Sequence, residues 1–251
     1  MSKLFSLQGR IYTAMRLSNG KPGPMTWVGN APTCQVKFTT ETSDKTESFS
    51  GNKLQYGRLQ KGKRAEVSLV LDEFLTSNLL LGLYGTKVAG ASGTVTNESF
   101  PTGLVVGDIV RLDKPFVSSV VITDSAAGPA TLTAGTHYKV KSDALGLIEI
   151  LDVAAFTQPF KAAYSNAASE TITMFTSAPP ERFLLLDGIN TENNQPVLME
   201  LPRVLFDPVG QLDLIMDDYG NLPLNGTALY DELNSADANM GGFGRIRQKV
   251  T

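Results

Sequence analysis

The sequence predicts a mainly β protein, with a β-sandwich or barrel core, one flanking α-helix and an inserted small β-rich module. The first observation is composition, because 251 residues with 23 Gly and 13 Pro are typical of a globular chain with many turns. The second is that apolar and polar residues alternate with a period of two in several segments, as in half-buried strands. The third is that helical spacing is clear in one short stretch.

The charge balance and the hydrophobic pattern exclude two classes of protein. With 22 basic and 25 acidic residues the formal net charge is -3, so the chain lacks the positive field that drives tight binding to DNA phosphates. No segment reaches the ~18 consecutive apolar residues of a membrane span, and the N-terminus has no uninterrupted apolar stretch of a signal peptide. We therefore expect neither export by a signal peptide nor insertion in a bilayer.

Reactive residues are scarce, so we expect no catalytic site, no cofactor and no metal ion. Cys34 is the only cysteine, which excludes an internal disulfide and a cysteine-based zinc site. His137 is the only histidine, and a histidine without a second ligand is usually structural. Serine-elbow, zinc-protease and Walker motifs do not occur. Asp217 and Asp218 are the first candidates for paired catalytic carboxylates, but neighbours in a strand face opposite sides, which favours a solvated turn.

The first part of the chain predicts an N-terminal arm followed by two strands. Residues 1–33 are broken by Gly and Pro and contain one short strand near 9–17. Residues 34–49 alternate as a half-buried strand with an acidic far end, and the Gly-punctuated residues 50–64 predict a basic loop. A second alternating strand over 64–71 runs directly into the helix.

Residues 71–85, LDEFLTSNLLLGLYG, predict the helix and give it surplus apolar surface. Asp72 is placed to cap it, and Gly85 ends it where a left-handed residue is favoured. Several apolar side chains lie outside the stripe that would face the core. These are Leu80, Leu81 and Tyr84. We expect a neighbouring subunit to cover this surface, unless the helix closes the end of its own barrel.

The remaining chain predicts an inserted module and a return to the core domain. We assign 87–180 to the module and 1–86 with 181–251 to the core. Strands of the module are expected at 108–112, 119–124, 137–142, 146–152 and 170–176. After it come a long hairpin with its turn at 190–195 and a bulge or edge at Pro202, a strand over 211–217, and a flexible or docking arm over 228–250.

The order of these parts resembles the major tail tube protein of long-tailed, non-contractile bacteriophages. The likeness rests on an arm, a strand with an acidic tip (VKFTTETSDKTESFSG), a strand running into a helix (VSLVLDEFLTSNLLLGLYG), a β-rich insertion, a long hairpin (FLLLDGINTENNQPVLMELPRVLF) and a closing LPLNGTAL. The insertion segment VVITDSAAGPATLTAGTHYKVKSDALGLIEILD also fits the pattern. The resemblance spans nearly the whole chain.

This resemblance implies a structural virion protein and not an enzyme. Six subunits would form a ring, and rings would stack head to tail into a hollow tail tube through which DNA passes to the host without tight binding. The implied partners are further copies of the chain, the tape measure protein, the tail terminator and the distal tail or tip proteins. The implied location is the virion, after assembly in the cytoplasm of the host bacterium.

Two sets of residues are candidates for the surfaces of such a tube. A DNA conduit should repel phosphates, so acidic residues on polar strand faces are candidates for the lumen. They are Glu41, Asp44, Glu47, Glu66, Glu200 and Asp213. Apolar residues of the helix and the basic loop are candidates for contacts between subunits. They are Phe74, Leu79, Leu80, Leu81, Tyr84, Leu59 and Tyr56.

Other interpretations stay open at this point. The inner tube of a contractile tail or of a secretion apparatus shares the fold, but the large insertion over 87–180 favours the non-contractile kind. A soluble carbohydrate-binding or adhesive β module would carry clusters of exposed aromatic residues in its loops, whereas Tyr and Phe are scattered here. An enzyme would need carboxylates that converge in a cleft.

Overall fold

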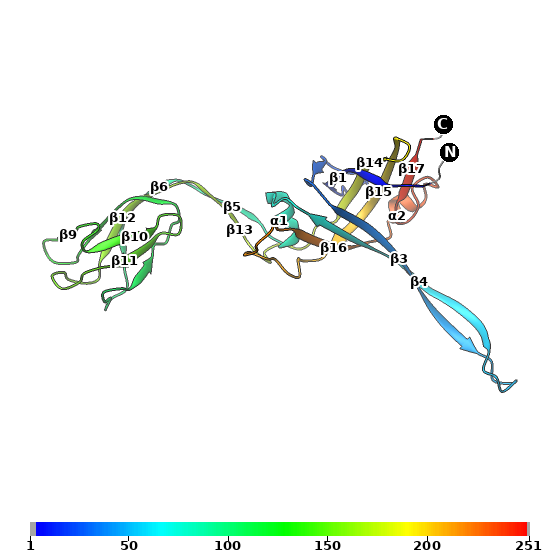
Figure 1. The fold of residues 1–251 in the computed structure, drawn as a ribbon, viewed down its shortest axis with the longest axis horizontal. Coiled ribbons are helices and arrows are strands. Elements are labelled where there is room, and N and C mark those ends of the chain that lie inside the picture. Colours follow the sequence, from blue (N-terminus) through cyan, green and yellow to red (C-terminus); the bar gives the residue numbers. More distant parts are fainter. Residues whose placement is uncertain (1–3, 250–251) are drawn as a thin grey trace. The chain divides into compact units, whose positions relative to one another are not determined.

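The chain folds as two compact units, each rich in β-strands (Figure 1). A computed structural model describes residues 4–249, with 48% of the residues in strands and two short helices. The first unit ends at Thr86 and resumes at Ile172, and the second runs from Lys87 to Thr171. Residues 172–180, which the sequence assigns to the insertion, thus lie with the first unit. Neither described helix has the length and apolar character needed to cross a membrane.

The first unit is built on one antiparallel sheet. Its strand order is β2–β1–β14–β15–β16–β4–β3, and β17 also pairs with β15. The strands are β1 (Leu7–Met15), β2 (Thr26–Trp27), β3 (Thr33–Thr46), β4 (Gln55–Leu71), β14 (Arg182–Asn190), β15 (Gln195–Phe206), β16 (Leu222–Ala228) and β17 (Arg245–Gln248). β1 matches the short strand predicted near 9–17, whereas β17 lies in the segment predicted to be a flexible or docking arm.

Alternating side chains of this sheet form the core of the first unit. On β4 the side chains of Ala65, Val67, Leu69 and Leu71 are buried, which confirms the predicted alternation. Residues of three further strands complete the cluster. They include Leu184, Leu201, Val204, Phe206, Leu222 and Leu224. Burying one such side chain stabilises the fold by about 1.5–3 kcal/mol, so the cluster fixes which face of each strand turns inward.

The hairpin of β14 and β15 has the predicted turn and the predicted bulge. Asn190 pairs with Gln195 across the turn. The register between the strands shifts once, between Leu201 and Val204, the stretch that contains Pro202. On its other edge β15 pairs with β17 up to Glu200 and with β16 from Val204. Proline has no N–H to donate. The bulge and the change of neighbour therefore fall at the residue that cannot continue a ladder.

Two predictions for the first unit are wrong. Residues 50–64 are predicted to be a loop, but β4 begins at Gln55 and pairs with β3 from there. This part of β4 is exposed on both faces, so its sequence shows no alternation. Residues 211–217 alternate like a strand, yet 207–221 form a loop without regular structure.

The helix α1 is shorter than predicted and lacks the predicted cap. It spans Thr76–Gly82, and its N-cap residue Leu75 makes no side-chain capping bond. Asp72 follows directly after β4 and accepts a bond from the side-chain amide of Asn30, while Glu73 accepts one from the Asn30 backbone N–H at 3.1 Å. Both carboxylates thus connect the end of β4 to the segment before β3 instead of capping the helix.

At the C-terminal end of α1 the left-handed residue is Tyr84, not the predicted Gly85. Tyr84 has a φ of 49°, and the Gly85 N–H donates to the Leu80 carbonyl at 3.0 Å, which closes the helix. Glycine is needed at position 85 for a different reason. A Cβ there would lie 2.1 Å from the carbonyl oxygen of Thr173. The close approach of two backbone segments therefore explains this glycine.

The second unit has its own core, shared by two small sheets. One sheet has the order β6–β12–β8–β9 and the other β10–β11–β7, while β5 and β13 form a two-stranded ribbon. The strands are β5 (Lys87–Gly90), β6 (Gly93–Ser99), β7 (Ile109–Arg111), β8 (Val117–Thr123), β9 (Thr131–Leu132), β10 (Tyr138–Ser142), β11 (Leu147–Ile150), β12 (Lys161–Asn166) and β13 (Ser169–Ile172). Ile122, Ile148 and Phe160 lie fully buried in the core.

His137 fixes a turn, because its Nδ1 accepts a bond from the Thr133 N–H at 2.8 Å.

Candidate assembly surfaces

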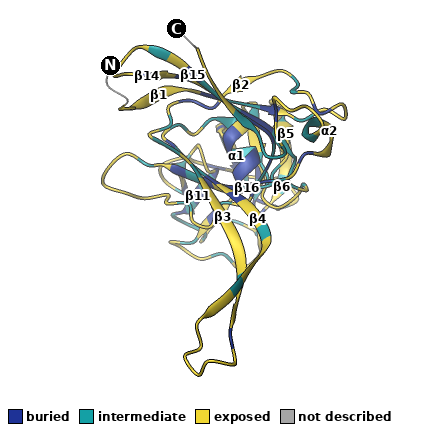
Figure 2. Cartoon of the chain, turned by 90° about the vertical axis from the view of Figure 1, so that its right-hand side faces the viewer, coloured by how far each residue is buried: buried dark blue, intermediate teal, exposed yellow. Residues whose placement is uncertain are grey.

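The hairpin of β3 and β4 extends beyond the sheet as a two-stranded ribbon. The strands pair as far as Thr46 with Gln55, whereas β16 pairs with β4 only at residues 65–71. Within the described chain, residues 55–64 therefore pair with β3 alone. Figure 2 shows that this projecting part is exposed over nearly its whole length. Such a ribbon is marginally stable in water without further contacts.

The ribbon carries large apolar side chains that its own sheet does not cover. Phe38 continues the core-facing side of β3 outward but is exposed. Phe49 in the turn is 79% exposed and meets Tyr56 edge to face, with the ring centroids 6.1 Å apart. Leu59 is exposed as well. Tyr56 and Leu59, two of the predicted contact residues, are thus available to a neighbour.

Glu47, a predicted lumen residue, instead closes the turn of the ribbon. Its carboxylate accepts bonds from the Ser50 hydroxyl and from the backbone N–H groups of Phe49 and Ser50, the last two at 2.8 Å. These bonds lower the pKa of Glu47 to about 2, and the bond from the Ser50 hydroxyl has the largest effect. Glu47 is also buried. A buried carboxylate with these partners does not face a channel, so this expectation is wrong.

Three further lumen candidates lie on β3 and β4, and each has a cation beside it. The pairs are Glu41 with Arg64, Asp44 with Arg58 and Glu66 with Lys37. By register Glu41 and Glu66 lie on one face, whereas Asp44 lies on the opposite, core-facing side. All three carboxylates are exposed, so each pair contributes about 0–1 kcal/mol. The structure does not gather the three acids on one face, and neighbouring cations offset their charge.

Glu200 and Asp213 complete the predicted lumen set, in two unrelated places. Glu200 on β15 is half-buried and accepts a bond from Arg245, with Arg247 3.4 Å away. It therefore holds β17 on the sheet. Asp213 lies in the loop 207–221 and accepts a bond from the Gln211 side chain at 2.7 Å.

Two of the five predicted contact residues around α1 pack on their own core. Leu81 is 4% exposed and belongs to the core cluster, so it cannot contact a neighbour and that expectation is wrong. Leu79 is half-buried against the same cluster. Leu80 and Tyr84 are half-buried, and Phe74 alone of the five is exposed. The helix thus covers its own core, which was the alternative interpretation.

The loop 207–221 is an exposed apolar segment that the sequence interpretation missed. Ile215 and Tyr219 are each 98% exposed, and Leu214 is exposed too. Pro208 and the glycines at both ends of GQLDLIMDDYG were the available signal for a loop. Irregular loops longer than about 12–15 residues are uncommon in compact domains and are usually functional or disordered.

The residues first considered for chemistry are dispersed. Asp217 and Asp218 are exposed in the loop 207–221, where Asp218 accepts a bond from the Tyr219 N–H at 2.7 Å. Burial raises the pKa of the Cys34 thiol. Across residues 4–249, no group of three or more His, Cys, Asp or Glu side chains is arranged to hold a metal ion.

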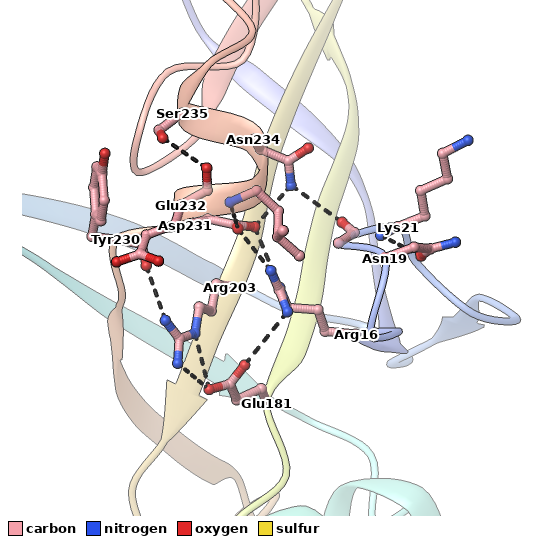
Figure 3. Close-up of polar contacts among 12 residues, drawn as sticks. Arg16, Asn19, Lys21, Glu181, Arg203, Tyr230, Asp231, Glu232, Asn234 and Ser235 are labelled. Carbon is pink, nitrogen blue, oxygen red and sulfur yellow. Dashed lines mark hydrogen bonds and ion pairs between the residues drawn. The ribbon is translucent and has the colours of Figure 1, made fainter.

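A buried ion pair fastens the C-terminal segment to β1 (Figure 3). Arg16, directly after β1, donates two bonds to Asp231, the shorter at 2.7 Å. Asp231 is fully buried, and it also caps α2 (Glu232–Ser235). Asn234 donates to Asp231 and to the Gly20 carbonyl. Burial raises the pKa of Asp231, but the bonds from Arg16 and Asn234 outweigh it, so the pKa lies below its usual value.

A second ion pair lies beside the first (Figure 3). Arg203 on β15 donates two bonds to Glu181, at 2.6 and 2.9 Å, and one to the Tyr230 carbonyl at 3.0 Å. These bonds lower the pKa of Glu181. The C-terminal segment, predicted to be a flexible or docking arm, is therefore fixed to the sheet of its own unit at several points. Arg16 and Asp231 are 215 residues apart in sequence, which is why no local pattern predicts their pairing.

Comparison with known proteins places the chain in one family. No curated protein matches the sequence. A family model does match, over residues 4–247, which includes both compact units. The chain therefore belongs to the family described as "Protein of unknown function UCP028589".

Proposed function

We propose that this chain is the major tail tube protein of a long-tailed, non-contractile bacteriophage. In this role it is a structural subunit of the virion and has no catalytic task. Six copies form a ring, and stacked rings form the hollow tube through which DNA passes. The tape measure protein, the tail terminator and the distal tail proteins are its partners at the lumen and the two ends of the tube.

The projecting ribbon of β3 and β4 is the observation that carries the proposal. Outside residues 65–71 of β4 it has no third strand among the described residues, and it is exposed on both faces. An isolated two-stranded ribbon gains little stability in water, and Phe49, Tyr56 and Leu59 remain uncovered on it. A subunit whose neighbours bind this ribbon explains its length and its apolar residues.

The unpaired edges of the main sheet support the same proposal. Among the described strands, β3 pairs only with β4, and β17 pairs only with β15. Open edges of this kind promote pairing with other chains, and closure into a larger barrel removes them. A ring of subunits whose sheets join side by side would satisfy these edges without uncontrolled aggregation.

The charge of the ribbon favours contact with other subunits over contact with DNA. Its residues 39–64 contain six basic residues, Lys45, Lys53, Arg58, Lys61, Lys63 and Arg64, against three acidic ones, Glu41, Asp44 and Glu47. A basic wall would bind phosphates and slow DNA, so the ribbon is a poor lining for the channel. It is suited to acidic surfaces of a neighbouring copy in a chain with net charge -3.

Electron microscopy of the purified full-length chain tests the proposed function. We expect hexameric rings and hollow tubes at high protein concentration, or after addition of tail tips that nucleate assembly. A three-dimensional reconstruction should place the ribbon against a neighbouring subunit. A chain that stays monomeric under all these conditions, including with tips, would contradict the proposal.

A further inference from the structure

Arg182 at the start of β14 is a partly buried cation without a counterion. Its Nε is sealed from solvent, and no described residue accepts a hydrogen bond from it. The residue lies on the same side of β14 as Leu184, which faces the core. Desolvation lowers the pKa of the guanidinium. An unpaired, partly desolvated charge destabilises a fold, so this arrangement calls for a partner outside the described chain.

Other arginines of the first unit show what is missing at Arg182. Arg16, Arg203 and Arg245 each bind a carboxylate at their end of the sheet. Arg10 lies over the ring of Trp27, 5.7 Å from its centroid. Arg182 has neither a carboxylate nor a ring among the described residues.

Arg182 borders a small pocket whose size and lining suit a single carboxylate. The pocket has a volume of about 260 Å³ and lies between β1, β2 and the first turn of α1. Three residues that carry a hydroxyl group line it besides the arginine, namely Thr13, Thr26 and Ser77. Met15, which also lines it, is exposed, so the rim of the pocket is apolar.

The loop 207–221 has the complementary chemistry. Asp217 is an exposed carboxylate, and no described residue is bonded to it. Its neighbours Ile215 and Tyr219 are the most exposed large apolar side chains of the chain as described, at 98% each. An acid between uncovered apolar residues matches a cation inside an apolar rim, in both charge and hydrophobicity.

We propose that Asp217 of one copy of this chain binds Arg182 of the next copy, with Ile215 and Tyr219 packed on the rim around Met15. The two surfaces consist of different residues, so the contact is heterologous and extends from copy to copy, as a ring or a tube requires. This inference rests on the proposed function and adds a specific contact to it.

The alternative occupant is a free anion or a nucleic acid phosphate. One recessed arginine in a chain with 25 acidic and 22 basic residues is a weak site for a polyanion, because affinity for nucleic acid grows with the number of phosphates neutralised. The apolar rim also gives no advantage to a small hydrated ion. Both occupants are nevertheless separated by the experiment below.

Binding of a labelled peptide to monomeric full-length protein tests the contact. The peptide comprises residues 210–220, GQLDLIMDDYG, and its fluorescence anisotropy reports binding. We expect saturable binding that Arg182→Met weakens about tenfold or more, as loss of a partly buried charge pair does. A peptide with Asp217→Asn should bind as weakly as the Arg182→Met protein does. The matched control peptide, Asp213→Asn, should bind like the wild-type peptide.

Unfolding of the same variant separates a binding role from a structural one. If Arg182 is paired only in the assembly, Arg182→Met removes an uncompensated charge from the monomer. The monomer then unfolds at the same or a higher urea concentration. A lower midpoint would show that the arginine is structural and would overturn the inference. Equal peptide affinity for wild type and Arg182→Met, or no binding at millimolar peptide, would overturn it too. Binding of sulfate or of single-stranded DNA in place of the peptide, with the same dependence on Arg182, would identify a site for free anions or phosphates and also overturn it.

The full chain provides the final test. Under conditions in which the wild-type chain forms rings, Arg182→Glu should abolish them. Adding Asp217→Arg to this variant should restore the rings, whereas adding Asp213→Arg should not. Rings that form with Arg182→Glu alone would overturn the contact and leave the proposed function standing. Peptide binding without any rings would leave the contact standing and contradict the proposed function.

Discussion

At the scale of single residues, Tyr84 shows local preference and tertiary contacts in conflict. A residue with a side chain costs roughly 1–2 kcal/mol in the left-handed region, and glycine stands directly after it at position 85. The contacts of the side chain offset this cost. The Tyr84 hydroxyl donates to the Phe206 carbonyl at 2.7 Å, and its ring meets Phe175 edge to face. A pattern rule that looks only for glycine cannot see these contacts.

Substitution of Tyr84 tests this explanation. Tyr84→Phe keeps the ring but leaves the Phe206 carbonyl without its donor, so we expect a loss of about 1 kcal/mol in the free energy of unfolding, measured with urea. The matched control is Tyr219→Phe, at a tyrosine that is almost fully exposed. It should leave the stability unchanged. Equal stability of both variants would contradict a stabilising bond at Tyr84.

The turn of the ribbon should depend on pH through Glu47. Its pKa is lowered from 4.5 to about 2 by bonds from Ser50 and Phe49. Because the pKa in the folded state is depressed, the stabilisation is fully present above pH 4.5 and is lost as the pH falls through about 2. NMR titration of the Phe49 and Ser50 amide signals should therefore show a midpoint near 2. A midpoint near 4.5 would mean that these bonds do not form in solution.

At the scale of elements, Gly85 sets how closely the end of α1 approaches the segment after β13. Gly85→Ala would place a Cβ 2.1 Å from the Thr173 carbonyl oxygen, so backbone must move. We expect a loss of about 1–3 kcal/mol in the free energy of unfolding, as for other overpacked sites. Gly210→Ala is the matched control, because nothing lies within 4 Å of a Cβ there. A Gly85→Ala variant as stable as Gly210→Ala would contradict the close approach.

A strand with one buried face is the easiest kind to predict from periodicity. Residues 64–71 show this, because Ala65 and Val67 meet the core while their neighbours do not. The outer half of β4 was missed because neither of its faces is buried, so no alternation exists to be found. Residues 211–217 also alternate, but they form an irregular loop and belong to no described strand. Periodicity alone therefore establishes neither burial nor hydrogen bonding.

Polar contacts between residues far apart in sequence limit how well the candidate surfaces can be predicted from the sequence. The sequence predicts on which face of their strands Glu41 and Glu66 lie. Their ion pairs with Arg64 and Lys37 depend on the register between β3 and β4, which the sequence pattern does not determine by itself. In the same way, Arg182 looks like any other arginine in the sequence. Only the structure shows that no described carboxylate pairs with it.

At the scale of the whole molecule, the chain consists of two units with separate cores. The buried cluster around Ile122 and Phe160 belongs entirely to residues 87–171, and the one around Leu69 and Phe206 belongs to the other unit. Composition and strand spacing predict this division and its first boundary, because an insertion must leave and re-enter the host fold. The second boundary is less marked in sequence, because a segment of mixed polar and apolar residues, TMFTSAPPE, separates β13 from β14.

The most direct test of the account removes the ribbon and leaves both cores intact. In this variant an Asn-Gly turn replaces residues 41–62 and joins Thr40 to Lys63, which are partners in the register. As a control of similar kind, a second variant replaces residues 91–168 by a short turn between β5 and β13. Electron microscopy should show rings and tubes for the wild type and the control, and only folded monomers for the chain without the ribbon. Tubes formed equally well without the ribbon would contradict the claim that it binds neighbouring subunits.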